Sequence, residues 1–183
     1  KINRFGDQTT RELRMQLRAQ LANSPPGLIL DLRNNPGGFL DAGISVTSQF
    51  IGTGLVMIEQ FGDGRERKYR ARPGGLATEI PLAVLINHGS ASAAEIVASA
   101  VKDYQRGAVV GENSYGKGTV QTWLDLSNEN GAVRITFARW LTPHGTSVDG
   151  EGIIPDLEVK RSYEQYQAGL DPQLDAAVEL LLQ

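Results

Sequence analysis

The chain has 183 residues, of which 40% are hydrophobic and 21% are charged. This composition is typical of a folded globular domain, and the length is sufficient for one sizeable core. The formal net charge of −3 comes from 18 basic and 21 acidic residues without a long run of either sign, which argues against nucleic-acid binding.

The absence of cysteine and the small number of histidines restrict the available chemistry. Without cysteine, disulfides and thiolate nucleophiles are excluded. His88 and His144 are far apart in sequence, and neither lies in a spaced ligand motif, so we expect no metal and no cofactor. No apolar stretch is long enough to cross a bilayer.

The first part of the chain predicts a βαβ unit. Residues 2–5 resemble the end of a strand, and Thr9-x-x-Glu12 is the pattern of a capping box that opens a helix. The apolar residues of this helix share one face: Leu13, Leu17 and Leu21. Residues 27–32 form a nearly continuous apolar run, as expected for a strand that is buried on both faces.

A loop rich in turn formers, with the sequence RNNPGG at positions 33–38, follows this strand. A tight connection to the next helix explains Pro36 and one glycine. The pair Gly37 and Gly38 additionally allows a bare N–H group to face a substrate carbonyl. The apolar residues of the next helix are Leu40, Ile44, Val46 and Phe50.

Strands that alternate with helices predict an α/β fold with a mixed sheet and packed helices. Residues 55–60 and 65–71 indicate a hairpin, and basic residues in its second strand indicate an exposed edge. Residues 81–86 and 108–111 indicate buried strands on either side of an amphipathic helix. This helix has apolar residues at one-turn spacing: Ile96, Val97, Ala100, Val101 and Tyr104.

The turn Ser90-Ala91-Ser92 presents a hydroxyl where a buried strand becomes a helix and backbone amides point outward, a setting that suits a nucleophile. A serine needs a base near neutral pH. His88 is more typical of an ordinary turn residue. A lysine can serve instead if burial among apolar or small residues keeps its amine neutral.

Lys117 is the candidate lysine, because Gly116 and Gly118 allow close backbone approach on both sides. Gln121 lies four residues further on the same face, and its uncharged amide could orient the amine without raising its pKa. An isolated serine and lysine would be interpreted as a helix cap and a surface residue. The assignment of Ser92 and Lys117 to a catalytic site therefore depends on the other motifs of the sequence.

The remaining residues extend the α/β pattern. Residues 118–126 and 132–141 predict a second hairpin across residues 127–131, which would extend the sheet behind the lysine. Residues 171–183 predict a final amphipathic helix. We expect residues 1–183 to form a single domain.

Several spaced motifs, in the same order, resemble the carboxy-terminal processing proteases, also called tail-specific proteases. These motifs are LILDLRNNPGG, SASAAE followed by a helix, VVGENSYGKGTVQ, and RWLTPHGTSVDGEGIIPD. The resemblance covers most of the chain. It implies a ClpP/crotonase-like α/β core and a serine endopeptidase with a Ser-Lys dyad that cleaves protein or peptide substrates.

The resemblance also implies a role for individual residues. Ser92 matches the nucleophile, Lys117 the general base, and Gln121 the residue that positions the lysine. One of Gly37 and Gly38, together with the Ala93 amide, matches the oxyanion hole. Asp103 falls where some members carry an acidic residue that is proposed to assist.

The chain departs from the family pattern at two points. Ala94 stands where many members have a serine before the glutamate. Members usually carry an N-terminal segment and a PDZ domain before this core, and no part of the sequence resembles either. The resemblance implies an extracytoplasmic location in periplasm, cell envelope or thylakoid lumen. It leaves open whether the chain forms a homo-oligomer.

Two other functions remain open from the sequence. The first is a peptide-binding module of the same fold, in which the dyad is catalytically idle. The second is an acyl-CoA enzyme, because the family core resembles the crotonase fold, whose glycine-rich loops also bind an oxyanion. Such enzymes need no Ser-Lys pair, and the likeness is at the level of fold.

Overall fold

The computed structural model describes residues 1–126 and 131–183. In these residues the strands form two sheets of four strands each. The first sheet is parallel, in the order β1 (Leu28–Asp31), β4 (Leu82–Ile86), β5 (Ala108–Gly111) and β8 (Leu157–Glu158). The second is antiparallel, in the order β3 (Glu66–Arg70), β2 (Leu55–Phe61), β7 (Ala132–Leu141) and β6 (Thr119–Asp125).

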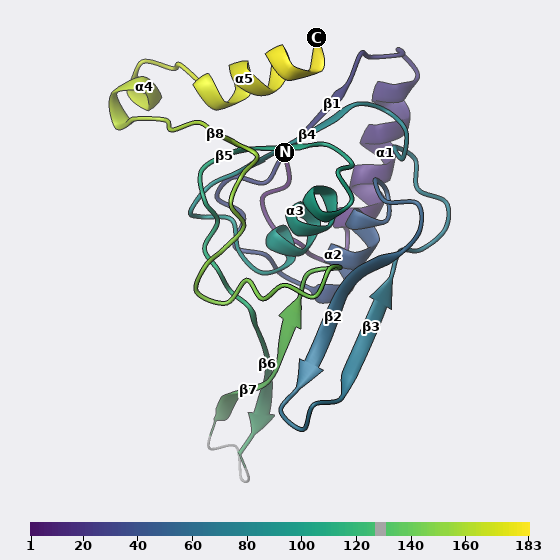
Figure 1. Cartoon of the computed structure of the whole chain (residues 1–183), viewed down its shortest axis with the longest axis vertical. Coiled ribbons are helices and arrows are strands. Elements are labelled where there is room, and N and C mark those ends of the chain that lie inside the picture. The colour runs from purple at the N-terminus through teal and green to yellow at the C-terminus, as the bar shows by residue number, and fades with distance from the viewer. Residues whose placement is uncertain (127–130) are drawn as a thin grey trace.

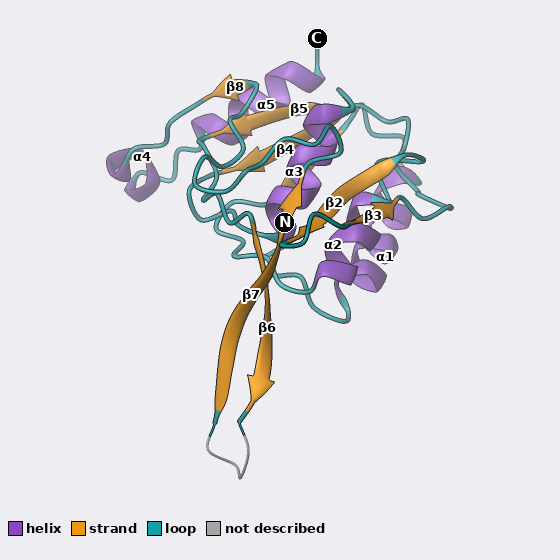
Figure 2. Ribbon diagram, turned by 60° about the horizontal axis from the view of Figure 1, so that its bottom comes forward, coloured by secondary structure: helices purple, strands orange, loops and turns teal. Residues whose placement is uncertain are grey.

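Helix α3 (Ala93–Asp103) lies between the sheets, in contact with β4 and β5 on one side and β2 on the other (Figure 2). Helix α2 (Leu40–Thr47) packs beside α3, and α1 (Thr9–Leu21) packs on α2. Helix α5 (Pro172–Leu181) contacts β1, β4 and β5, and α4 (Tyr163–Gln167) precedes it in the chain (Figure 1).

Strand β4 is apolar at every position because both of its faces are covered. Val84 and Ile86 belong to the main core, which includes α3. Ala83 and Leu85 belong to a second cluster that contains Ala177 of α5. All of these side chains are inaccessible to solvent. The non-alternating pattern of β4 is thus the pattern of a central parallel strand.

The order of the parallel sheet brings three distant segments to one edge. Since β1, β4 and β5 are parallel neighbours, the loops that follow them leave the sheet at the same edge. The loop after β1 contains Gly37, the turn after β4 ends at Ser92, and the segment after β5 leads to Lys117. The candidate site therefore lies at the carboxyl edge of this sheet.

Strands β6 and β7 project from the body as a long hairpin (Figure 2). Near the body, β7 also pairs with β2, from Phe61–Ala138 to Ile58–Leu141. A register shift between Val120 and Gln121 interrupts the pairing of β6 with β7. Residues 127–130 of the turn predicted at residues 127–131 lie outside the described residues.

The predicted α/β class is confirmed, with parallel and antiparallel pairing both present. The two kinds of pairing lie in separate sheets, and the hairpin expected behind the lysine extends the antiparallel one. The exposed basic edge expected in the first hairpin is also confirmed, because β3 is an edge strand with mostly exposed residues.

Two local predictions are wrong. The residue that caps α1 is Gln8, not Thr9, because the Thr9 hydroxyl accepts a hydrogen bond from Gly6 N (2.9 Å) and donates to Arg4 O (3.1 Å) in the preceding segment. Residues 2–5 do not form a strand, and only Phe5 makes a bridge, to Gly38. The short elements β8 and α4 were not predicted.

Candidate active site

Ser92 is the N-cap residue of α3 and ends the turn that follows β4. Its backbone angles are φ 55° and ψ −117°, a conformation that costs a non-glycine residue on the order of 1–3 kcal/mol. In strand-to-helix turns of known hydrolases, strain of this kind exposes a nucleophilic hydroxyl. The sequence prediction that this turn presents Ser92 agrees with its half-buried position.

The Ser90 hydroxyl, by contrast, is fully occupied by structural contacts. Ser90 is completely buried. Its Oγ donates to Leu32 O (2.9 Å) and accepts from Asn87 N (3.0 Å). These bonds hold the turn against the end of β1, so Ser90 has no free hydroxyl for chemistry.

The buried carboxylate of Glu95 connects the two candidate catalytic residues. Glu95 lies in the first turn of α3 and has no solvent exposure. Its Oε2 accepts from Ser92 N (2.7 Å) and from Lys117 N (3.0 Å). Its Oε1 accepts from Gly116 N (2.7 Å) and the Ser114 hydroxyl (2.6 Å). Four donors thus stabilise the buried carboxylate. The backbones of Ser92 and Lys117 are thereby bonded to the same side chain.

Both backbone polar groups of Lys117 form hydrogen bonds. Its N–H donates to Glu95, and its carbonyl accepts from the buried indole Nε1 of Trp140 (2.8 Å). Burial lowers the pKa of the Lys117 amine from its ordinary value of 10.5, and the positive charge of Arg134 lowers it further, whereas Glu95 raises it. The net lowering favours the neutral amine that a base requires.

Ser92 and Lys117 line one cavity of about 510 Å³. Its apolar wall comes from α2, α3 and the antiparallel sheet, and its polar groups include Gln121 and two arginines. The lining residues are Arg4, Gly38, Phe39, Leu40, Met57, Ser92, Ala93, Ile96, Lys117, Thr119, Val120, Gln121, Trp123, Arg134 and Trp140. The cavity is large enough for several groups of an extended peptide.

Gln121 lines this cavity, but its side chain is bonded elsewhere. Its Nε2 donates to Thr136 Oγ1 on β7 (3.1 Å). Among the described residues, no hydrogen bond or ion pair involves the Lys117 amine. The role of Gln121 in positioning the lysine stays a prediction.

Gly37 is in close contact with the turn that ends at Ser92. A methyl group at Gly37 would lie 2.7 Å from Ser92 Cβ and 2.9 Å from Ala93 N, so no other residue fits there without movement. The Gly37 N–H donates to Asn35 Oδ1 (2.8 Å). Within the described residues, the N–H groups of Gly38 and Ala93 have no hydrogen-bond acceptor.

The other titratable residues considered from the sequence lie away from this cavity. Asp103 is at the opposite end of α3 from Ser92, and its carboxylate accepts from His144 N (2.8 Å). His88 is exposed in the turn after β4. None of these three residues lines the cavity that contains Lys117.

Glu95 is the residue at this site that the sequence interpretation did not assign. Two signals pointed to it. The spacing Ser92-x-x-Glu95 is that of a capping box, and Glu95 precedes the apolar residues Ile96 and Val97 in a helix expected to be buried. Its partners Ser114, Gly116 and Lys117 come from another segment, so only the structure reveals them.

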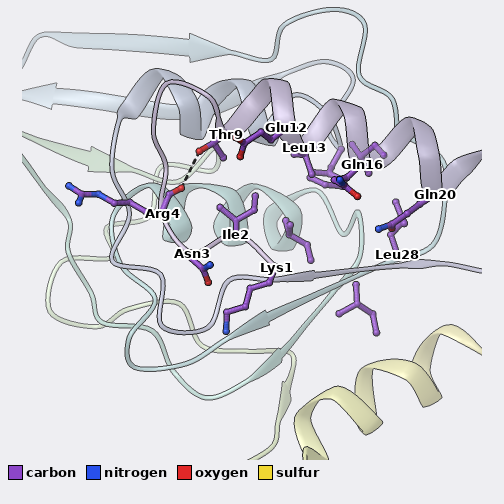
Figure 3. A pocket seen from close by; sticks show the side chains of 14 residues that line it. Lys1, Ile2, Asn3, Arg4, Thr9, Glu12, Leu13, Gln16, Gln20 and Leu28 are labelled. Atoms are coloured by element: carbon purple, nitrogen blue, oxygen red, sulfur yellow. Dashed lines mark hydrogen bonds between the residues drawn. The ribbon is translucent and has the colours of Figure 1, made fainter.

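A larger cavity, of about 690 Å³, lies between the N-terminal segment, α1 and β1 (Figure 3). Its polar wall includes Asn3, Glu12, Gln16 and Gln20. It contains neither a serine nor a histidine and is separate from the carboxyl edge of the parallel sheet. The Ser92 cavity is therefore the better candidate for an active site, although it is smaller.

The sequence pattern described as "Peptidase family S41" matches residues 1–159. The chain belongs to this family. The prediction of a tail-specific protease relative is therefore confirmed.

Curated S41 relatives carry names of processing proteases. The chain is 41% identical to the carboxy-terminal-processing protease of Bartonella bacilliformis, a match that covers 95% of the chain and 41% of the relative. It is 35% identical to the carboxyl-terminal-processing protease of Synechocystis, over 99% of the chain and 43% of the relative. The chain thus spans less than half the length of these relatives.

A solved structure supports the S41 fold. The photosystem II D1 C-terminal processing protease superposes with a TM-score of 0.82 at 34% sequence identity. The match covers 87% of this chain and 41% of that protein. An S41 protease from Bacteroides fragilis superposes with a TM-score of 0.81 at 17% identity, over 98% of this chain and 52% of that one, which supports the fold alone.

Proposed function

We propose that this chain is the catalytic core of a serine endopeptidase that cleaves proteins or peptides near their C-termini. The observation that carries the proposal is the shared Glu95 oxygen, which accepts from the backbones of both Ser92 and Lys117. The two side chains also line one cavity. Family membership and the names of the relatives agree with this activity.

In the proposed reaction, the Ser92 hydroxyl attacks a peptide carbonyl while Lys117 takes its proton. Lys117 then returns the proton to the leaving amine, and the C–N bond breaks to leave an acyl-enzyme on Ser92. Water, deprotonated by the same lysine, hydrolyses the ester. The lowered pKa of Lys117 supports this role, because more of the amine is neutral at a given pH.

The oxyanion of the tetrahedral intermediate would accept hydrogen bonds from Ala93 N–H and Gly38 N–H. Ala93 is the first residue of α3, where backbone N–H groups have no partner inside the helix. Gly38 is preferred to Gly37, because the Gly37 N–H is already bonded to Asn35. Loss of one such donor typically raises the barrier by about 2.7–4 kcal/mol.

A catalytically idle peptide-binding module is the second candidate function. It is favoured by the side chain of Gln121, which is bonded to Thr136 while no described residue orients the Lys117 amine. In this alternative the cavity binds a peptide, but Ser92 is not activated.

Labelling with a fluorophosphonate separates the two functions, because an unactivated hydroxyl does not react. The full-length protein should be labelled on a single residue, Ser92, as identified by peptide mass spectrometry. Lys117→Ala and Lys117→Arg should both abolish labelling, because a guanidinium keeps its charge and cannot accept a proton. Absence of labelling in the unsubstituted protein would favour the idle module.

We also propose an extracytoplasmic location, which is supported by the family resemblance. Among the described residues, no helix is long and apolar enough to cross a membrane. Cell fractionation with compartment markers tests this location, and recovery with a cytoplasmic marker would contradict it.

A further inference from the structure

The cavity that contains Ser92 carries more positive charge than the proposed mechanism uses. Its lining includes three basic side chains, Arg4, Lys117 and Arg134, and no carboxylate. The mechanism needs Lys117 alone, in its neutral form. Among the described residues, neither Arg4 nor Arg134 forms an ion pair with an acidic side chain. The two arginines therefore create a positive potential in the cavity.

The Arg134 guanidinium lies over an aromatic ring. Arg134 lies on β7, opposite Trp123 of β6, and its guanidinium carbon is 5.9 Å from the centre of the indole ring. Trp123 also lines the cavity and is 64% exposed. A guanidinium over an indole face keeps its N–H groups at the edge of the ring, free to bind a ligand.

Arg134 lies on the lysine side of the cavity. Lys117 and Arg134 line the same cavity, and Arg134 pairs with Trp123 on β6, the strand that begins two residues after Lys117. The charge of Arg134 also contributes to the lowered pKa of Lys117, after the larger effect of burial. Lys117 delivers a proton to the leaving amine in the proposed reaction. The segment of substrate on the leaving-group side therefore lies closest to Arg134.

Arg4 reaches the same cavity from the N-terminal segment. Its side chain extends away from the other residues that line the larger cavity beside α1 (Figure 3). Arg4 adds to the positive potential, but no aromatic ring holds its guanidinium. Of the two arginines that line the cavity, Arg134 is therefore the one whose guanidinium lies over an aromatic ring.

We propose that Arg134 is a specificity-determining residue that binds a carboxylate on the leaving-group side of the substrate. This inference rests on the proposed peptidase function of the same cavity. The carboxylate is either the C-terminus of the substrate or an aspartate or glutamate side chain in the departing segment. The planar fork of arginine matches either group through two parallel N–H···O bonds.

A binding experiment tests the proposal without requiring turnover. In the full-length Ser92→Ala protein, fluorescence anisotropy would measure the Kd of one labelled peptide in two forms, with a free C-terminal carboxylate and with a carboxamide. A third peptide would combine the carboxamide end with an internal glutamate. At least one carboxylate form should bind about tenfold more tightly than the neutral form at low salt, and which form does so identifies the source of the carboxylate.

Substitution of Arg134 should remove this preference. In Arg134→Gln the ratio of the Kd values for acid and neutral peptides should approach one, and Arg134→Lys should restore it only in part, because the ammonium lacks the planar fork. Arg139→Gln is the matched control, because Arg139 lies on the same strand and is exposed but does not line the cavity. A carboxylate-binding site elsewhere in the protein would change the ratio of the Kd values by the same factor in all variants.

A ratio that Arg134→Gln leaves unchanged would overturn the proposal, as would equal binding of all three peptides by the Ser92→Ala protein. These results would leave the peptidase function intact if Ser92 is still labelled by the fluorophosphonate in the otherwise unsubstituted protein. Failure of labelling, with the Kd ratio still dependent on Arg134, would reject the peptidase function and retain the carboxylate site.

Discussion

At the scale of single residues, the two hydroxyls of the Ser90-Ala91-Ser92 turn differ in their surroundings. Ser90 bonds to Leu32 and Asn87 inside the protein, whereas Ser92 lies in the cavity with a strained backbone. The same residue type thus fixes the turn at one position and lines the cavity two residues later.

This difference predicts opposite outcomes for two substitutions. Ser92→Ala should abolish cleavage and labelling while it leaves the stability nearly unchanged. Ser90→Ala should retain most of the activity but lower the free energy of unfolding by about 1–3 kcal/mol, because Asn87 N loses its buried partner. Peptide cleavage and denaturant unfolding of both variants measure these effects. Loss of activity in Ser90→Ala alone, at a temperature where it is folded, would contradict the assignment of Ser92.

Glu95 provides a second residue-scale prediction. In Glu95→Gln, one amide oxygen must replace two carboxylate oxygens that accept from four donors. We expect a loss of stability of about 1–3 kcal/mol for each donor left without a partner, together with reduced labelling of Ser92. Glu151→Gln, at an exposed position, is the control. Normal thermal stability of Glu95→Gln would show that the four bonds do not hold the site together.

The sequence predicts the residue types at this site better than their contacts. Ser92 and Lys117 are candidates because of their local surroundings, a small-residue turn and flanking glycines, together with the spaced family motifs. The contacts of Glu95 depend on residues about twenty positions later, and those of Gln121 on its pairing with β7. Such contacts follow from tertiary packing and are not encoded in a local pattern.

At the scale of elements, a polar network joins the loop after β1 to the start of α5. The nearly buried Arg33 guanidinium donates to both oxygens of Asp31 (3.0 and 2.9 Å), to Asp171 Oδ1 (2.7 Å) and to Gln173 Oε1 (3.0 Å). Asp171 also caps α5 by accepting from Leu174 N (3.1 Å). This network anchors the segment that leads to Gly37 and Gly38.

The network predicts acid sensitivity. Burial raises the pKa of Asp31 and of Asp171, but the hydrogen bonds and charge of Arg33 outweigh this effect, so both pKa values are lowered. Since the folded pKa is below the unfolded value of about 3.9, the stabilisation is present above that pH and is lost as the pH falls through the folded pKa. Thermal unfolding between pH 7 and pH 2.5 should show this decline.

Replacement of Arg33 provides the comparison for the acid transition. In Arg33→Met the protein should be less stable at pH 7, because Asp31 and Asp171 lose their shortest charged hydrogen bonds and keep only Lys1 (3.7 Å) and Arg161 (3.3 Å), respectively. Its stability should depend less on pH below about 4. Equal pH dependence in both proteins would show that other carboxylates control acid unfolding.

Elements with a strong local pattern were predictable, and those defined by distant partners were not. The apolar run of β4 and the one-turn spacing of α3 indicate their structures directly. Strand β8 has only two residues and exists because it pairs with β5. The capping prediction at Thr9 failed because its hydroxyl found partners in the preceding segment instead of in the helix.

At the scale of the whole molecule, the candidate site lies where the parallel sheet meets the antiparallel one. The parallel sheet delivers Gly38 and Ser92 at its carboxyl edge, while β6 and β7 supply Gln121 and Arg134 from the other sheet. The division into two sheets was not predictable from the strand patterns, because β2 and β7 pair across about eighty residues of sequence. The cavity is lined by β2, β6 and β7, so its shape depends on this long-range pairing.

The central claim, that Lys117 is the base for Ser92, is tested most directly by the pH dependence of Ser92 labelling. The protonated form of Lys117 cannot accept a proton, so the rate of Ser92 labelling should rise with pH as this one amine loses its proton. Because the pKa of Lys117 is lowered, the midpoint of the rise should lie below 10.5. A histidine base would place this rise at about pH 6.5. The double variant His88→Gln and His144→Gln should therefore keep the same profile. Loss of the rise in that variant would contradict the Ser-Lys account.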